Sequence, residues 1–101
     1  MSLSNKQFRF TFMVGQLIDF AYKNGYTLSL GSAHARDGHI DDSFHYKRLA
    51  LDLNLFKNKK YLTKTSDHLP LGKFWESIGG TWGGRWDDGN HYSYGEGVRE
   101  K

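Results

Sequence analysis

Leucines alternate with other residues along the middle of the chain. Every odd position from 49 to 55 is a leucine, and the positions between them hold Ala50, Asp52, Asn54 and Phe56. A period of two residues is typical of a strand that buries one face in the core. We therefore expect Asp52 to leave this strand on the face opposite the leucines, with the small side chain of Ala50 beside it.

Two other segments have the period of an amphipathic helix. The first follows a capping-box sequence at residues 4–7, and its apolar positions recur at i, i+3, i+4, i+7 and i+11: Phe10, Met13, Val14, Leu17 and Ala21. Asn24-Gly25 supplies its stop signal. The second starts at Leu69-Pro70, ends at Gly79-Gly80, and carries its own stripe of apolar residues: Leu71, Phe74, Trp75 and Ile78.

The remaining segments are short strands and loops. Residues 26–30 and 91–94 read as strands, and residues 57–60 read as a turn that leads into a returning strand at 61–62. Residues 32–42, 63–68 and 82–90 have no period and are expected to be loops. The sequence thus predicts one α+β domain over residues 1–101, with a small, largely antiparallel sheet and two main helices packed on one face.

Composition limits the chemistry more than it identifies it. The 101 residues include no cysteine, so a bound metal would need His and carboxylate ligands. No apolar run approaches the ~20 residues of a membrane span, and we see no signal peptide, so we expect synthesis in the cytoplasm and no membrane partner. The net charge of +3 is compatible with an anionic wall or with nucleic acid. A nucleic-acid module using Lys57, Lys59 and Lys60 is the least favoured interpretation, because these lysines are not interleaved with aromatic residues.

A few residues are candidates for metal chemistry. His45 precedes Asp52 by seven positions, and Asp88 precedes His91 by three. Two imidazoles and one carboxylate can give zinc three protein ligands and leave the fourth position to water. Each residue alone is also explained as a solvated or hydrogen-bonded side chain, so the hypothesis depends on their occurring together.

The order of these residues resembles a known family of zinc peptidases. The motifs are Ser43-x-His45-x6-Asp52 and, downstream, Trp82-Gly83-Gly84-x-Trp86-x-Asp88-x-x-His91. They resemble the motifs of the peptidases that include D-Ala-D-Ala carboxypeptidases and phage L-alanyl-D-glutamate endolysins. The second half of the chain matches closely, and the first half matches only in outline.

The resemblance implies a role for each matched residue. His45, Asp52 and His91 would bind zinc, and Asp88 would be the catalytic carboxylate that carries the proton. Asp87 competes with Asp88 on chemistry alone. Ser43 would brace the site by hydrogen bonding, and a substrate carboxylate would bind an arginine, for which Arg36 is the nearest candidate. His34 and His39 are loop histidines that we interpret as solvated.

The function implied by the resemblance is hydrolysis of the peptide stem of peptidoglycan by a monomeric enzyme of the phage endolysin type. The bond between L-Ala and D-Glu is the preferred target, and the host wall is the place of action. A D-Ala-D-Ala carboxypeptidase remains an alternative, because the two activities share these motifs. A second alternative is a zinc-stabilised binding domain without catalysis, similar to the signalling domain of hedgehog proteins.

Overall fold

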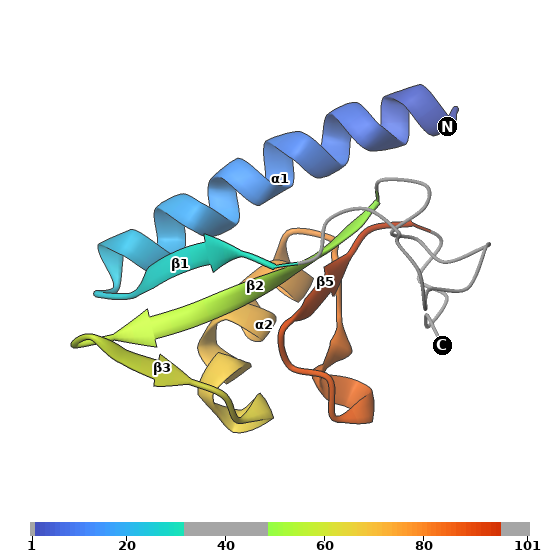
Figure 1. Cartoon of the computed structure of the whole chain (residues 1–101). Coiled ribbons are helices and arrows are strands. Elements are labelled where there is room, and N and C mark those ends of the chain that lie inside the picture. The colour runs from blue at the N-terminus through green and yellow to red at the C-terminus, as the bar shows by residue number, and fades with distance from the viewer. Residues whose placement is uncertain (1, 32–48, 96–101) are drawn as a thin grey trace.

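A computed structural model of the chain describes residues 2–31 and 49–95. Its elements, in chain order, are α1 (Leu3–Lys23), β1 (Thr27–Leu30), β2 (Ala50–Lys57), β3 (Lys60–Leu62), η1 (Thr65–His68), α2 (Leu69–Ser77), β4 (Thr81–Trp82), η2 (Gly83–Trp86) and β5 (His91–Ser93). Helices α1 and α2 cover one side of the antiparallel sheet (Figure 1). The α+β prediction is confirmed. Within the described residues, no helix is both long and apolar enough to cross a membrane.

The sheet is built around β2. Its strands follow the order β1-β2-β5-β4, and β3 pairs with β2 outside this path. β5 pairs with residues 50–52 of β2, and β3 pairs with residues 55–57. Since β1 also pairs with residues 53–56, β3 and β5 must share the opposite edge of β2, one after the other. At Leu53 and Asn54 this edge of β2 pairs with neither β3 nor β5, and we call this opening the fork.

The alternation along β2 is as the sequence predicts. Its three leucines and the preceding one are buried: Leu49, Leu51, Leu53 and Leu55. Asp52 and Asn54, on the other face, are only half-buried. Ala50 lies on their face but is only 1% exposed, so the sheet is covered at that point.

Aromatic contacts join the helices to the sheet. The ring of Trp75 on α2 meets Phe10 of α1 and Tyr92 of β5 edge to face, with centroids 5.8 and 5.9 Å apart. Its indole N–H donates to the carbonyl oxygen of Ser93 at 2.9 Å. Trp75 is completely buried, so its apolar bulk and its hydrogen bond both tie α2 to β5.

Three predictions about local structure were wrong. Helix α1 begins two residues earlier than the capping-box sequence suggested, because the hydroxyl of Ser2 accepts from the backbone N–H of Asn5 at 3.1 Å. The expected loop at residues 63–68 contains the 3₁₀ helix η1, in which the carboxylate of Asp67 accepts from the N–H of Lys64 at 3.0 Å. The expected loop at residues 82–90 contains η2 and follows directly from β4. Segments this short carry no period that a sequence pattern can reveal.

Two glycines on helices allow a matched test of the packing. A Cβ added at Gly72 would collide with the indole ring of Trp82, whereas one added at Gly15 has nothing within 4 Å. We expect Gly72→Ala to lower the free energy of unfolding by about 1–3 kcal/mol through overpacking. Gly15→Ala should instead raise it by roughly 0.5–1 kcal/mol, because alanine favours the helix. Urea denaturation of both variants measures the difference, and equal effects would contradict the packing of Trp82 on α2.

Candidate functional site

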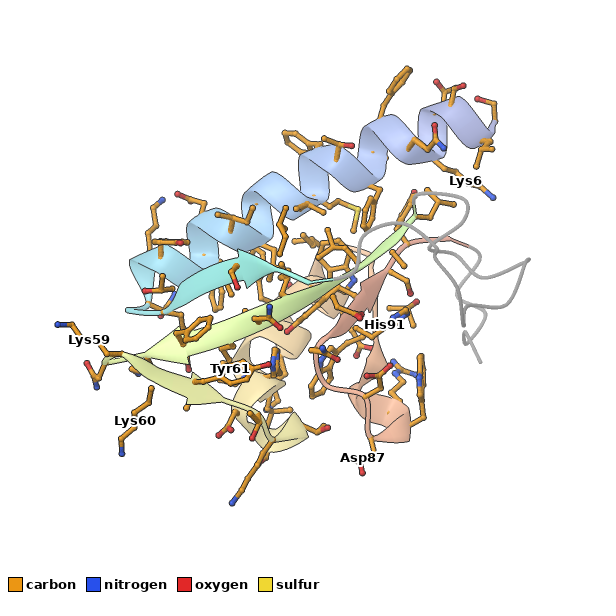
Figure 2. The ribbon with its side chains drawn as sticks, viewed as in Figure 1. Lys6, Lys59, Lys60, Tyr61, Asp87 and His91 are labelled. Carbon is orange, nitrogen blue, oxygen red and sulfur yellow. The ribbon has the colours of Figure 1, made fainter. Side chains whose placement is uncertain are left out.

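Asp52 and His91 are brought together by the pairing of two strands. They are direct partners in the antiparallel register of β2 and β5. Oδ1 of Asp52 lies 3.6 Å from Nδ1 of His91, and the imidazole is 93% buried on its side chain while the carboxylate is more open. Two residues that are 39 positions apart in the sequence therefore face each other on one sheet (His91 is labelled in Figure 2).

The spacing of these two atoms suits a shared metal ion. A separation of 3.6 Å is beyond ordinary hydrogen-bond length. Two ligands at about 2.0–2.2 Å from one tetrahedral zinc ion would stand roughly 3.3–3.6 Å apart. The donor types, one imidazole and one carboxylate, also suit zinc. Asp52 and His91 are therefore compatible with a place in one coordination sphere.

The rest of the predicted ligand set is not seen. His45, Ser43 and Arg36 lie outside the described residues, as do His34 and His39. Within residues 2–31 and 49–95, no three His, Cys, Asp or Glu side chains form a group that could hold a metal ion. The ligand set thus stays a prediction, of which the structure brings two members together.

Asp88 lies in the loop that leads into β5. Its backbone N–H donates to the carbonyl of Gly83 at 2.9 Å, and its own carbonyl accepts from the N–H of His91 at 3.1 Å. Although the residue is exposed overall, partial burial of its carboxyl group raises its pKa. The neighbouring His91 opposes this shift in the pKa of Asp88, and the negative charges of Asp52 and Asp87 add to it. Asp88 is thus within electrostatic reach of both facing residues.

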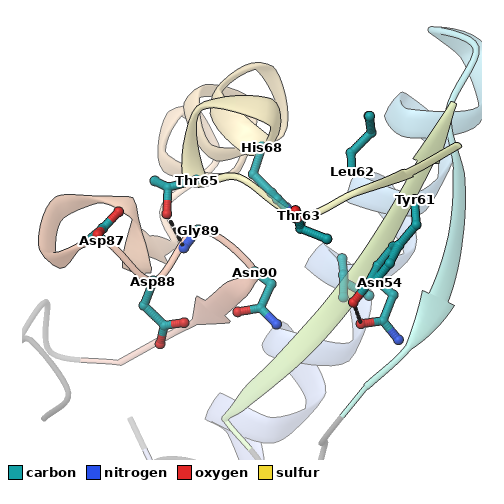
Figure 3. A pocket seen from close by; sticks show the side chains of 11 residues that line it. Asn54, Tyr61, Leu62, Thr63, Thr65, His68, Asp87, Asp88, Gly89 and Asn90 are labelled. Atoms are coloured by element: carbon teal, nitrogen blue, oxygen red, sulfur yellow. Dashed lines mark hydrogen bonds between the residues drawn. The ribbon is translucent and has the colours of Figure 1, made fainter.

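Asp87 differs from Asp88 in its backbone and its direction. It caps η2 in the left-handed conformation, with φ 62° and ψ 37°. Aspartate tolerates this conformation better than most residues do. The two carboxylates leave the loop in different directions (Figure 3). Asp87 therefore has a structural role that accounts for it without catalysis.

The Trp-Gly-Gly run explains how this loop closes tightly. A Cβ at Gly83 would collide with the carbonyl of Asp88 and with Cβ of His91, and a Cβ at Gly84 would strike the ring of Trp82. The indole N–H of Trp82 donates to the carbonyl of Gly89 at 2.7 Å. Gly83 and Gly84 let backbone segments of the loop lie close together, and the hydrogen bond from Trp82 fixes the loop at Gly89.

Other residues that brace the loop were not foreseen. The hydroxyl of Thr65 on η1 accepts from the N–H of Gly89 at 3.1 Å. Glu76 of α2 accepts two hydrogen bonds from Arg85, and its Oε2 also accepts from the N–H of Trp82 at 3.2 Å. These contacts cross between elements whose sequence patterns are unrelated, so no local signal marks them.

A cavity of about 170 Å³ adjoins Asp88 (Figure 3). It lies at the fork between β3 and β5. Its lining comes from four segments: Leu53 and Asn54; Tyr61, Leu62 and Thr63; Thr65 and His68; and residues 87–90. His68 is buried there, with Nδ1 2.8 Å from the hydroxyl of Tyr92. Burial lowers the pKa of His68 and so favours its neutral ring, while the negative charge of Asp67 opposes this shift.

Comparison with protein families gives a match to the chain. The family model described as D-alanyl-D-alanine carboxypeptidase matches residues 36–94, which include both motifs and every predicted site residue. No curated protein and no solved structure gave a significant match to the chain. The matched region covers more than half of the sequence, and the chain therefore belongs to the D-alanyl-D-alanine carboxypeptidase family of peptidases.

Proposed function

We propose that this chain is a zinc-dependent peptidase that hydrolyses the peptide stem of peptidoglycan, with the L-Ala–D-Glu bond as its target. The observation that carries the proposal is the juxtaposition of Asp52 and His91 at 3.6 Å, with Asp88 in their electrostatic field. The family match supports peptidase activity. The choice of bond, and a role of the phage endolysin type acting on the host wall, rest on the resemblance of the two motifs to endolysins.

In this proposal Asp52, His91 and His45 would hold zinc. The chemistry that zinc supplies in such a site is polarisation of the scissile carbonyl and a pKa of water that is lowered toward about 7. Asp88 would accept a proton from the attacking water and donate it to the departing amine, which is the work of a general base and then a general acid. Its place on a loop held by Gly83, Trp82 and Thr65 would keep the carboxylate aimed at the reacting bond.

The second candidate is a D-Ala-D-Ala carboxypeptidase, which the description of the matching family favours. A carboxypeptidase must bind the terminal carboxylate of its substrate, and arginine is the side chain best suited to that task. Arg36 would serve either activity, because both substrates carry a carboxylate next to the cleaved bond. The bond must therefore be identified from the products.

Metal analysis tests the ligand assignment. The purified protein should contain about one zinc per chain, and chelation should abolish hydrolysis. Asp52→Ala and His91→Ala should each lose most of the zinc and the stabilisation that comes with it. Asp19→Ala, which removes an exposed carboxylate paired with Lys23 on α1, is the control and should keep the metal. Full zinc content in both ligand variants would refute the assignment.

The proton carrier is tested with two neighbouring acids. Asp88→Asn should keep zinc and lose about 10²- to 10⁴-fold in kcat, the usual contribution of a general acid–base group. Asp87→Asn should lose at most a few-fold, because asparagine also accepts the left-handed conformation seen there. Turnover is measured on a soluble stem peptide. If Asp87→Asn lost more of its kcat than Asp88→Asn, Asp87 and not Asp88 would be the proton carrier.

The products of wall digestion identify the bond. Mass spectrometry of the released fragments should show new amino termini at D-Glu and new carboxyl termini at L-Ala. Release of free D-alanine alone would assign the chain to the carboxypeptidases instead. A protein with a full complement of zinc that releases neither product would be a binding domain, contrary to our proposal.

A further inference from the structure

The cavity beside Asp88 lies where neither β3 nor β5 pairs with β2. β5 leaves the edge of β2 at Asp52, and β3 joins the same edge only at Leu55. The N–H of Leu53 donates to the carbonyl of Asn90 at 2.9 Å, and this bond closes one end of the opening. The cavity of about 170 Å³ therefore begins where the strand pairing of the candidate site ends. Because Asp88 itself lines the cavity, a substrate bound at Asp88 would adjoin it.

The lining of the cavity disfavours an anionic occupant. It offers the side-chain amides of Asn54 and Asn90 and the hydroxyl groups of Tyr61 and Thr63, beside the apolar surface of Leu62. Among the described residues, neither lysine nor arginine lines it, whereas Asp87 and Asp88 do. A carboxylate would find no positive partner there and would be repelled. A group with several hydroxyl or amide functions and some apolar surface fits best.

Tyr61 lines the cavity, and its ring is held in place by its neighbours. Tyr61 is 58% exposed, yet its ring stacks on that of Phe56 with centroids 5.0 Å apart. The hydroxyl of Tyr61 donates to Oδ1 of Asn54 at 3.4 Å, and the amide of Asn54 donates to Ser29 at 3.2 Å. The two side chains are thus positioned across three strands. An aromatic face next to amide and hydroxyl groups suits a sugar ring, which has apolar C–H faces and polar edges.

The distance from Asp52 to Asn54 along β2 matches the distance from the cleaved bond to the sugar in peptidoglycan. Asn54 follows Asp52 by two residues on the same face of β2, or about 7 Å at roughly 3.3 Å per residue. An extended peptide covers about 3.5 Å per residue. In peptidoglycan, L-Ala is joined directly to an N-acetylated muramic sugar. A cut after L-Ala therefore places this sugar one residue away from the bond, within reach of Asn54 and Tyr61. A cut between the two terminal D-alanines would leave it several residues away.

We propose that this cavity, with Tyr61 and Asn54 at its mouth, is a subsite for the N-acetylated amino sugar that carries the stem peptide. The inference rests on the proposed function and makes it more specific. The enzyme would recognise the junction between glycan and peptide, rather than the peptide alone. The acids beside the cavity would meanwhile turn away the carboxylates of the distal stem.

Kinetics on two substrates test the subsite. The zinc-loaded chain is given the same stem peptide with and without an N-acetylmuramoyl group on L-Ala. We expect KM to be at least about tenfold lower for the sugar-bearing substrate, and Tyr61→Thr to reduce this ratio to below about twofold. Threonine keeps the strand preference of β3. Tyr22→Ala is the control and should keep the full ratio, since Tyr22 lies on α1 and bonds to Leu28. Should Tyr61→Thr fail to fold, Asn54→Thr carries the same prediction.

A binding measurement separates this inference from the peptidase proposal. On titration with a disaccharide of N-acetylglucosamine, the NMR resonances of Asn54, Tyr61 and Thr63 should shift and saturate. Equal KM values for the two substrates would overturn the subsite and leave the peptidase standing. If the chain cuts neither substrate, the peptidase fails, and the titration alone decides: saturable shifts at these residues support the subsite, and unchanged resonances overturn it.

Discussion

The candidate site depends on the burial of one face of β2. Its leucines fill the core, and because side chains alternate, Asp52 must emerge on the other face. A slip of one residue would turn Asp52 into the core and the leucines toward solvent. Each exposed leucine would cost about 1.5–3 kcal/mol. The register that sets Asp52 opposite His91 is thus held by the hydrophobic core, and the polar site contributes little to its own construction.

Trp82 imposes a second constraint, because it links the core to the loop that carries Asp88. This side chain is 7% exposed and belongs to the core cluster, with its ring against Gly72 of α2. Its single polar atom reaches out to the carbonyl of Gly89, one residue after Asp88. A buried indole has little conformational freedom, because it has few rotamers and its N–H requires a partner. The position of Asp88 is therefore set by packing between α2 and the loop.

The sequence was informative where burial imposes a period. The stripes of α1 and α2 and the alternation of β2 were recovered, with ends displaced by one or two residues. The meeting of Asp52 with His91 came from the order of motifs and not from any period, since register between distant strands leaves no local trace. Residues such as Tyr61, Asn54 and Thr65 were missed for the same reason. They meet only because β3 and β5 share one edge of β2.

Charge distribution gives the site its chemical character. The chain has a net charge of +3, yet Asp88 lies within electrostatic reach of two further carboxylates, those of Asp52 and Asp87. Carboxylates held this close repel one another unless a cation or a proton relieves them. A divalent ion between Asp52 and His91 would relieve the repulsion and attract the oxygen of a peptide carbonyl. The neighbouring cavity combines Asp87 and Asp88 with amide and hydroxyl side chains, so a substrate would be oriented by two unlike regions. The first region would favour a carbonyl oxygen, and the second disfavours anions and offers amide and hydroxyl partners.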